Sequence, residues 1–182
     1  MAISESQNLP QTAPHPTADA LPTAEGALQM AMESTDRTIH GSRCLIIGYG
    51  RIGRLLADRL LALGAEVTVS ARKYGDLAWI RAWGCQSVRT EALTGRLDRF
   101  HLIFNTAPAL VLDGPRLRET REDCIIIDLA SAPGGVDLEE ARRLGRQALP
   151  APGLPGKAAP RTAAAAIRDS VYHILEERGE PI

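Results

Sequence analysis

The sequence predicts an α/β fold in three layers, with a doubly wound parallel sheet between two layers of helices. Six apolar runs of strand length alternate with helical patterns along the 182 residues, and such alternation is typical of parallel sheets. No hairpin signal or internal repeat competes with it. The first run leads directly into closely spaced glycines and a helical pattern, which is how a nucleotide-binding unit of this fold begins.

Composition excludes several classes of function. The net charge of -1 and the lack of a basic stripe argue against a nucleic-acid partner, and apolar runs such as Cys124–Ile127 are too short to cross a membrane. Met1–Glu5 lacks the charged and apolar regions of a signal peptide, so we expect a cytoplasmic protein. Cys44, Cys85 and Cys124 share no short spacing, which predicts three small packing residues and no metal site.

The chain opens with a segment, residues 1–21, that we expect to be a disordered tail because it is rich in Pro, Ala, Thr, Ser and Gln. Residues 22–182 form the predicted domain. Its first element is a helix from Thr23 to Ser34, with Pro22 near its start and apolar residues at helical spacing. This helix has too little apolar surface to stand alone, so we expect it to pack on the domain or on another chain.

A glycine turn follows the first strand, Cys44–Ile47. It reads Gly48-x-Gly50-x-x-Gly53 and leads into a helical pattern over Ile52–Leu63. The first glycine permits a tight turn, the second lets the backbone approach a pyrophosphate, and the third lets the helix lie close to the strand. The anion would rest on free amides at the positive end of the helix dipole. A turn that serves packing alone is the alternative, but the flanking strand and helix favour dinucleotide binding.

The tip of the second strand, Val67–Ser70, indicates which cofactor binds. NAD-specific domains usually end this strand with an acid that holds the adenosine ribose hydroxyls. Here Ser70 is followed by Ala71, Arg72 and Lys73, which offer a 2′-phosphate two cations and a hydroxyl, with no acid to repel it. We therefore predict NADP as the cofactor. The alternative is that both cations are solvated loop charges.

A short helix, Gly75–Trp83, and a weak strand, Gln86–Val88, complete the first half of the predicted sheet. Trp79 and Trp83 are expected to be packing residues of this helix rather than a platform on which a ligand stacks. A polar helical turn over residues 91–97 then leads into the second half.

Polar residues end the next two strands. The strand Phe100–Asn105 is followed by Thr106. In a doubly wound sheet the carboxyl end of this strand borders the cofactor at the topological switch point, so Asn105 and Thr106 are placed to contact ribose or nicotinamide. Without that position the segment would be interpreted as a simple turn. After a helix over residues 114–120, the strand Cys124–Asp128 ends in a carboxylate. Asp128 is a site candidate, and the capping of loop amides is an equally good role for it.

The last third of the chain contains a capped helix over residues 137–144, a strand over residues 147–149 and a final helix from Thr162 to about Glu177. The segment before that helix carries two glycines, Lys157 and Arg161, which form a second potential anion site or a plain linker. With right-handed crossovers the strand order would be 3-2-1-4-5-6, which is a Rossmann-type sheet.

Several of these segments together resemble one family, the A-subunit of dipicolinate synthase, in its C-terminal, cofactor-binding portion. The resemblance runs from about Pro22 to the last helix. Besides the glycine turn, the motifs that carry it are Pro22-Thr-Ala-Glu-Gly-Ala-Leu-Gln-Met-Ala, Ala71-Arg-Lys73, Phe104-Asn-Thr-Ala-Pro-Ala-Leu-Val111, Ile127-Asp-Leu-Ala-Ser-Ala-Pro-Gly-Gly135 and Ala151-Pro-Gly-Leu-Pro-Gly-Lys157. More distantly, the last two motifs look like segments of alanine dehydrogenase and transhydrogenase cofactor domains.

The resemblance implies an NADP-dependent oxidoreductase subunit that oxidises a dihydrodipicolinate, derived from 4-hydroxy-tetrahydrodipicolinate, to dipicolinate in the mother cell of a sporulating bacterium. It implies the flavoprotein-like B-subunit of dipicolinate synthase as partner, and we also expect a homo-oligomer. Members of the family carry a further domain ahead of the Pro22 helix. We therefore expect either a truncated form or a partner that supplies that wall of the active-site cleft.

The resemblance also assigns residues to the cofactor. The pyrophosphate contacts are Gly48, Tyr49, Gly50, Arg51, Ile52 and Gly53, and the 2′-phosphate contacts are Ser70, Arg72 and Lys73. The residues on the nicotinamide side are Asn105, Thr106, Ala107, Pro108, Asp128, Leu129, Ala130 and Ser131.

The implied reaction makes two further demands. A dicarboxylate substrate needs cations, and oxidation to an aromatic ring needs the removal of a proton as well as a hydride. Asp128, as proton acceptor, and Lys157 are the candidate catalytic residues, and Lys157 and Arg161 are the candidates for binding the substrate carboxylates. A non-catalytic NAD(P)-binding regulatory or scaffold module is the alternative function. The lack of the family's N-terminal domain favours this module, whereas the retained loops at Asn105, Asp128 and Lys157 favour the dehydrogenase.

Overall fold

Six parallel strands form a single sheet in the order β3-β2-β1-β4-β5-β6, which confirms the predicted Rossmann-type topology. The structure is a computed structural model and describes residues 19–177, so residues 1–18 of the expected tail lie outside it. The strands are β1 Arg43–Ile47, β2 Glu66–Ala71, β3 Gln86–Arg89, β4 Leu102–Asn105, β5 Ile125–Asp128 and β6 Gln147–Pro150.

The central strands are apolar along their length because helices cover both faces of the sheet. On β1, Cys44 and Ile46 pack with one layer of helices, whereas Leu45 and Ile47 pack with the other. All four side chains are fully buried. The alternation divides the core into two clusters, one on each face of the sheet, and confirms the predicted three-layer arrangement.

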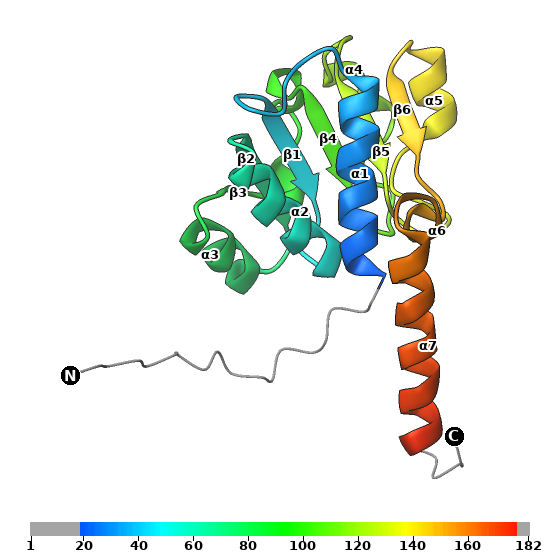
Figure 1. The fold of residues 1–182 in the computed structure, drawn as a ribbon. Helices are drawn as coiled ribbons and strands as arrows, with labels where there is room; N and C mark the ends of the chain where they lie inside the picture. The colour runs from blue at the N-terminus through cyan, green and yellow to red at the C-terminus, as the bar shows by residue number, and fades with distance from the viewer. Residues whose placement is uncertain (1–18, 178–182) are drawn as a thin grey trace, which may run out of the picture.

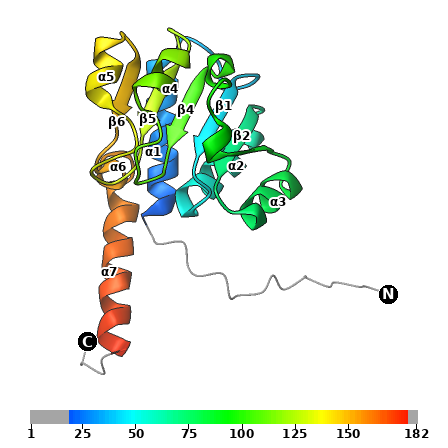
Figure 2. The same cartoon turned by 180° about the vertical axis from the view of Figure 1, so that it is seen from behind.

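Helices α1 to α3 cover one face of the sheet, and α4 and α5 cover the other (Figures 1 and 2). The helices are α1 Ala20–Ser34, α2 Arg51–Ala62, α3 Tyr74–Ala82, α4 Gly114–Glu119, α5 Leu138–Arg143, α6 Leu154–Ala158 and α7 Pro160–Glu177. Short 3-10 turns lie at Thr90–Ala92 and Leu97–Arg99. Helix α7 leaves the body at the end toward which the strands point (Figure 1).

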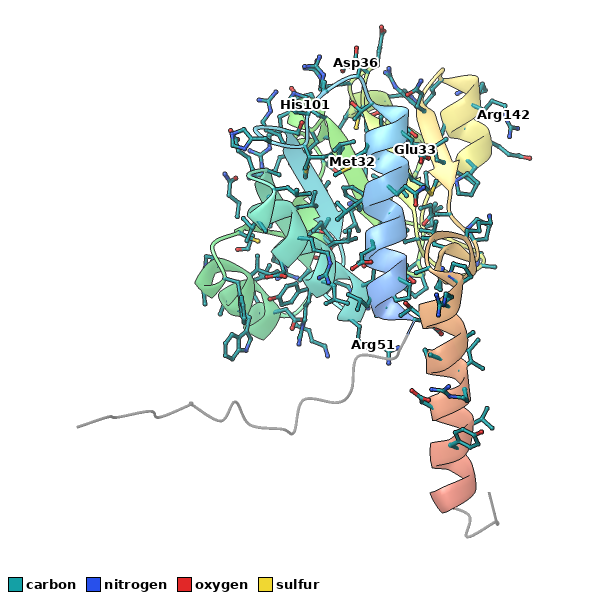
Figure 3. The ribbon with its side chains drawn as sticks, viewed as in Figure 1. Met32, Glu33, Asp36, Arg51, His101 and Arg142 are labelled. Atoms are coloured by element: carbon teal, nitrogen blue, oxygen red, sulfur yellow. The ribbon has the colours of Figure 1, made fainter. Side chains whose placement is uncertain are left out.

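The carboxyl ends of the central strands meet at one edge of the sheet. Ile47 at the end of β1 is paired with Asn105, and Asn105 is paired in turn with Asp128. The start of α2, marked by Arg51, lies at this edge, whereas His101 lies at the opposite edge (Figure 3). The topology therefore gathers the sequence motifs at the place where Rossmann-type folds bind dinucleotides.

Helix α1 begins earlier than the predicted Thr23, at Ala20, so the last residues of the expected tail are helical. The Thr23 amide donates a hydrogen bond to Asp19 O over 3.1 Å, which closes the first turn. Pro22 lies within that turn, where the amide that proline lacks would have no intrahelical acceptor. Proline therefore does not delay the start of this helix.

Helix α6, Leu154–Ala158, lies in a segment that we expected to be a loop. It packs against α1 at Gly26, where an added Cβ would stand 2.9 Å from Ala158 Cβ and 3.3 Å from Leu154 Cδ2. The close approach of two helices therefore depends on the missing side chain at Gly26. This contact fixes the position of the segment that follows β6.

The three cysteines are buried and free, as expected of packing residues. Burial raises the pKa of the Cys44 and Cys124 thiols to about 12 and also raises the pKa of Cys85. These thiols therefore remain protonated and unreactive near neutral pH. Over residues 19–177, no helix combines the length and the apolar composition needed to cross a bilayer.

Candidate nucleotide-binding site

The glycine turn between β1 and α2 can be built only with glycine at two of its positions. Gly48 has φ +101°, and an added Cβ would stand 2.5 Å from Thr106 Oγ1. Its amide donates to Ser70 O over 3.0 Å, which ties the turn to the end of β2. A Cβ on Gly53 would overlap Gly48 O. The first turn of α2 thus lies directly against the end of the strand, as the glycine spacing predicts.

Gly50 differs from Gly48 and Gly53 because the space next to its α-carbon is open. It caps α2 with φ -80° and ψ -164°, and no atom lies within 4 Å of the position of an added Cβ. The first turn of α2 contains no acidic residue. Helix amides without intrahelical acceptors and an unobstructed approach are what a pyrophosphate requires, so the turn fits this group.

A cavity of about 420 Å³ opens beside the start of α2, at the carboxyl edge of the sheet. Its volume lies in the range of ligand sites, and it fits part of an extended dinucleotide. Four segments surround it: the starts of α1 and α2 and the loops after β5 and β6. The lining residues from these segments are Asp19, Ala20, Thr23, Arg51, Ile52, Leu129, Ala130, Ser131, Ala132, Ala151, Pro152, Gly153, Leu154 and Pro155.

Asn105 and Asp128 form a buried hydrogen-bond network between the loops after β4 and β5. Asn105 Nδ2 donates to Asp128 Oδ1 over 2.7 Å and to Ala107 O over 3.0 Å. Asp128 Oδ1 also accepts from the Ala130 amide over 3.2 Å, and Oδ2 accepts from the Gly135 amide over 3.0 Å. An added Cβ on Gly135 would stand 2.6 Å from Ala107 O, so glycine lets the loops meet.

This network bears on the expectation that Asp128 accepts a proton from substrate, which stays a prediction. The residue is 6% exposed, and its two carboxylate oxygens accept from three donors. The capping role that the sequence left open is the one that this geometry supports. Asn105 is fully buried and bonded in the same network, where it links the loops after β4 and β5. Its contact with ribose or nicotinamide stays a prediction.

The three residues expected to contact the 2′-phosphate differ in their exposure to solvent. Arg72 and Lys73 are exposed at the end of β2. Ser70 is fully buried, and its Oγ accepts a hydrogen bond from Thr90 Oγ1 over 3.5 Å. The geometry therefore leaves two cations available to an anion and does not support the predicted contact from the Ser70 hydroxyl.

The expected substrate-binding cations lie outside the cavity. Lys157 is in the last turn of α6, and Arg161 is in the first turn of α7. Both side chains are exposed, and neither lines the cavity. Their predicted role in binding substrate carboxylates therefore requires a second polypeptide that packs against α6 and α7. The segment Ala151–Pro155 ahead of them does line the cavity; the sequence predicted an anion site or a plain linker here and did not predict that these residues form a cavity wall.

A second hollow, of about 460 Å³, is lined by residues of both α2 and α3 and shares no residue with the cavity. Trp79 and Trp83 line it and are 61% and 63% exposed, so the expectation that they are packing residues is wrong. Leu77 and Ile80 already fill the inner face of the short helix α3, which leaves both indoles on its outer side. Tyr49 of the glycine turn lines this hollow as well.

Residues 18–135 match the family described as D-isomer specific 2-hydroxyacid dehydrogenase, NAD binding domain. The chain belongs to this family. It is an NAD(P)-binding domain of the Rossmann type, and the glycine turn and the carboxyl ends of β1, β4 and β5 fall inside the matched region.

Similarity to known proteins extends beyond that region. The chain is 38% identical to the dipicolinate synthase A-subunit of Bacillus subtilis (strain 168) over 159 residues, 87% of its length. The crystal structure of the dipicolinate synthase A-subunit from Bacillus halodurans matches with a TM-score of 0.85 and 39% identity over 88% of the chain. Transhydrogenase from Sinorhizobium meliloti shares the fold, with a TM-score of 0.79 and 16% identity over 90% of the chain and 55% of that structure.

The NAD(P)-binding domain is thus similar to that of the dipicolinate synthase A-subunit, which confirms the resemblance seen in the sequence motifs. The chain spans about half the length of these relatives, 54% of the Bacillus subtilis protein and 55% of the Bacillus halodurans structure. Within residues 19–177, no group of three or more His, Cys, Asp or Glu side chains is placed to hold a metal ion.

Proposed function

We propose that the chain is the NADP-binding half of a dehydrogenase that oxidises dihydrodipicolinate, formed from 4-hydroxy-tetrahydrodipicolinate, to dipicolinate during sporulation. The observation that carries this proposal is the open glycine turn beside a cavity of about 420 Å³ whose walls include the loops after β5 and β6. Those loops contain two of the motifs that resemble the dipicolinate synthase A-subunit. The proposal places the chain in the cytoplasm of the mother cell.

The chain's own residues have defined tasks in this proposal. Amides at the start of α2 hold the pyrophosphate, and Arg72 and Lys73 hold the 2′-phosphate. The Asn105–Asp128 network keeps the loops after β4 and β5 at the edge of the cavity, on the side where the nicotinamide would lie. Bound NADP would supply the hydride acceptor. Lys157 and Arg161 are proposed to meet the substrate carboxylates once a second polypeptide closes this side.

We expect the chain to bind NADPH more tightly than NADH, and Arg72→Asp to reverse that preference. The substitution removes a charge-assisted contact to the 2′-phosphate and adds a carboxylate that suits ribose hydroxyls, so NADPH affinity should fall about ten- to a hundredfold. Titration followed by nicotinamide fluorescence gives both dissociation constants. Arg142→Asp makes the same charge change on the distant helix α5 (Figure 3) and should leave both constants unchanged. Equal wild-type affinities for the two nucleotides would exclude NADP specificity.

A second polypeptide is part of the proposal because the relatives of the chain are A-subunits, which implies a B-subunit. Helix α7 supports this idea, since its exposed Ile167, Val171 and Tyr172 lie on the helix that leaves the body at the end toward which the strands point. Exposed apolar side chains on a protruding helix favour a partner. We propose a homo-oligomer joined by the flavoprotein-like B-subunit of dipicolinate synthase.

The activity assay follows from this assembly. We expect the chain, mixed with its flavoprotein-like partner, NADP and freshly prepared 4-hydroxy-tetrahydrodipicolinate, to produce NADPH that is detected by its absorbance. The same mixture with Gly50→Ala should produce none, because the added methyl group occupies the pyrophosphate approach. Nucleotide binding without turnover, in the presence and absence of the partner, would favour the alternative below.

The alternative is a non-catalytic NAD(P)-binding module that regulates or scaffolds a dehydrogenase. The specific observation in its favour is that the buried Asp128 carboxylate accepts hydrogen bonds from three neighbouring donors, while Lys157 and Arg161 lie outside the cavity. A module of this kind would bind nucleotide with the same preference and would show no turnover with any partner.

A further inference from the structure

Side chains from three separate segments meet beside the tip of β2. In the parallel pair β2 and β3, Ala71 is opposite Arg89, so Arg89 leaves the sheet at the level of Arg72. Tyr74 is the first residue of α3, and Glu91 lies in the 3-10 turn that follows β3. The pairing of β2 with β3 therefore brings Arg89 and Glu91 to the tip of β2. From the sequence alone, Arg72 and Lys73 are the charged residues expected at this tip.

Arg89 is held in place by two neighbours. Its Nη1 donates to Tyr74 Oη over 2.8 Å, and its Cζ stands 5.0 Å from the centroid of the Tyr74 ring. Its Nε donates to Glu91 Oε2 over 3.1 Å. The side chain is nevertheless 42% exposed. A guanidinium that is fixed in orientation and open to solvent loses little entropy when it binds a phosphate.

Glu91 brings a negative charge to the same corner. A hydrogen bond from its own backbone amide, then the bond from Arg89, and the charges of Arg89 and Arg72 hold the pKa of this carboxyl below its ordinary value. It is therefore ionised at neutral pH, close to the cations that would receive a 2′-phosphate. A carboxylate attracts ribose hydroxyls and repels a phosphate, so its position bears directly on which nucleotide binds.

We propose that Arg89 is a third cation of the 2′-phosphate site and that Glu91 tunes this site by competing with the phosphate for Arg89. The proposal rests on the proposed function, because it assumes that a dinucleotide lies across the carboxyl edge. Arg89 then raises the affinity for NADPH alone. Glu91 keeps the guanidinium oriented when no phosphate is present and offsets part of its charge when one binds.

The first test removes the third cation. Arg89→Ala should weaken NADPH binding about tenfold, as expected for the loss of one charge-assisted hydrogen bond, and should change NADH binding less than about twofold. Arg89→Lys keeps the charge and should retain part of the lost affinity. Arg81→Ala is the matched control: Arg81 donates to Ser87 Oγ over 2.9 Å at the other end of β3. Equal losses for both nucleotides, or no loss for either, would overturn the assignment of Arg89.

The second test removes the competing charge. Glu91→Gln keeps the size of the side chain, and it should tighten NADPH binding about threefold while leaving NADH unchanged. Glu139→Gln, in the first turn of α5, is the control. If Glu91→Gln instead weakens NADH and leaves NADPH unchanged, Glu91 is a ligand of the ribose and the proposal is wrong. All constants come from equilibrium titrations of the whole chain and need no turnover.

Different results would contradict the proposed function and the inference about Arg89 and Glu91. If neither nucleotide binds to the wild-type chain, the proposed function fails. If Arg72→Asp reverses the nucleotide preference and Arg89→Ala does not alter it, NADP binding stands and only the inference about Arg89 and Glu91 is lost. Circular dichroism of each variant confirms that it is folded before its affinity is compared.

Discussion

Gly53→Ala should destabilise the domain by about 1–3 kcal/mol and eliminate measurable nucleotide binding. The added Cβ overlaps Gly48 O and stands 3.1 Å from Gly48 C, so it meets backbone atoms that cannot rotate away. Relief requires α2 to move off the end of β1, which takes the helix amides away from the pyrophosphate position. In a domain of this size the unfolding midpoint should fall by about 2–4 °C for each kcal/mol. Thermal unfolding followed by circular dichroism measures the loss.

Gly50→Ala provides the matched control within the same turn. No atom lies within 4 Å of its added Cβ, and φ at this position is -80°, which alanine adopts without strain. Its folding free energy should stay within about 0.5 kcal/mol of wild type, while its nucleotide affinity falls. If Gly53→Ala unfolds at the wild-type temperature, the contact between α2 and the strand end is not as close as the structure indicates.

Asp128→Ala should cost at least about 3 kcal/mol of folding free energy, because it leaves three donors without their acceptor in a buried place. Those donors are Asn105 Nδ2 and the amides of Ala130 and Gly135. Asp128→Asn keeps one acceptor oxygen but turns an amino group toward a donor, so it should cost about 1–3 kcal/mol. Urea unfolding gives the free energies, and hydrogen exchange should show the loss of protection in the loop after β5.

An Asp→Asn substitution just before β5 is the control for Asp128, because the carboxylate there is exposed whereas that of Asp128 is buried. Asp123 precedes β5 and bonds with Arg121 and Arg37 at the surface. These partners, with the bond from Arg121 as the largest cause, lower the pKa of Asp123 to about 2. Asp123→Asn should cost no more than about 1 kcal/mol, because exposed ion pairs contribute little. If Asp128→Ala keeps wild-type stability and loses only turnover, Asp128 is a catalytic acid or base after all.

Local patterns were sufficient to predict the sheet and the glycine turn. Apolar runs between helical patterns define the strands, and the requirement for glycine at positions 48 and 53 follows from backbone packing that the spacing already implies. The order of the six strands then follows from right-handed crossovers. These features depend on residues that are close in sequence or on rules that hold for all parallel sheets.

The composition of the site was harder to predict because it depends on pairing between distant segments. Ser70 is bonded to Thr90 only because β3 lies beside β2. Arg89 joins the tip of β2 for the same reason. Whether Asp128 is free or already bonded depends on how the loops after β4 and β5 fold back. None of these relations leaves a periodic signal in the sequence.

The cavity beside α2 has a consequence for how the protein matures during synthesis. Its walls come from the beginning and the end of the described chain, since Asp19 and Thr23 face the Ala151–Pro155 segment across it. The start of α2 is synthesised early, but the cavity beside it is complete only when the Ala151–Pro155 segment has been synthesised and α6 packs on α1. We therefore expect a nucleotide that needs this cavity to have no effect on the early part of the chain. It stabilises only the finished domain, by binding the native state and no earlier one.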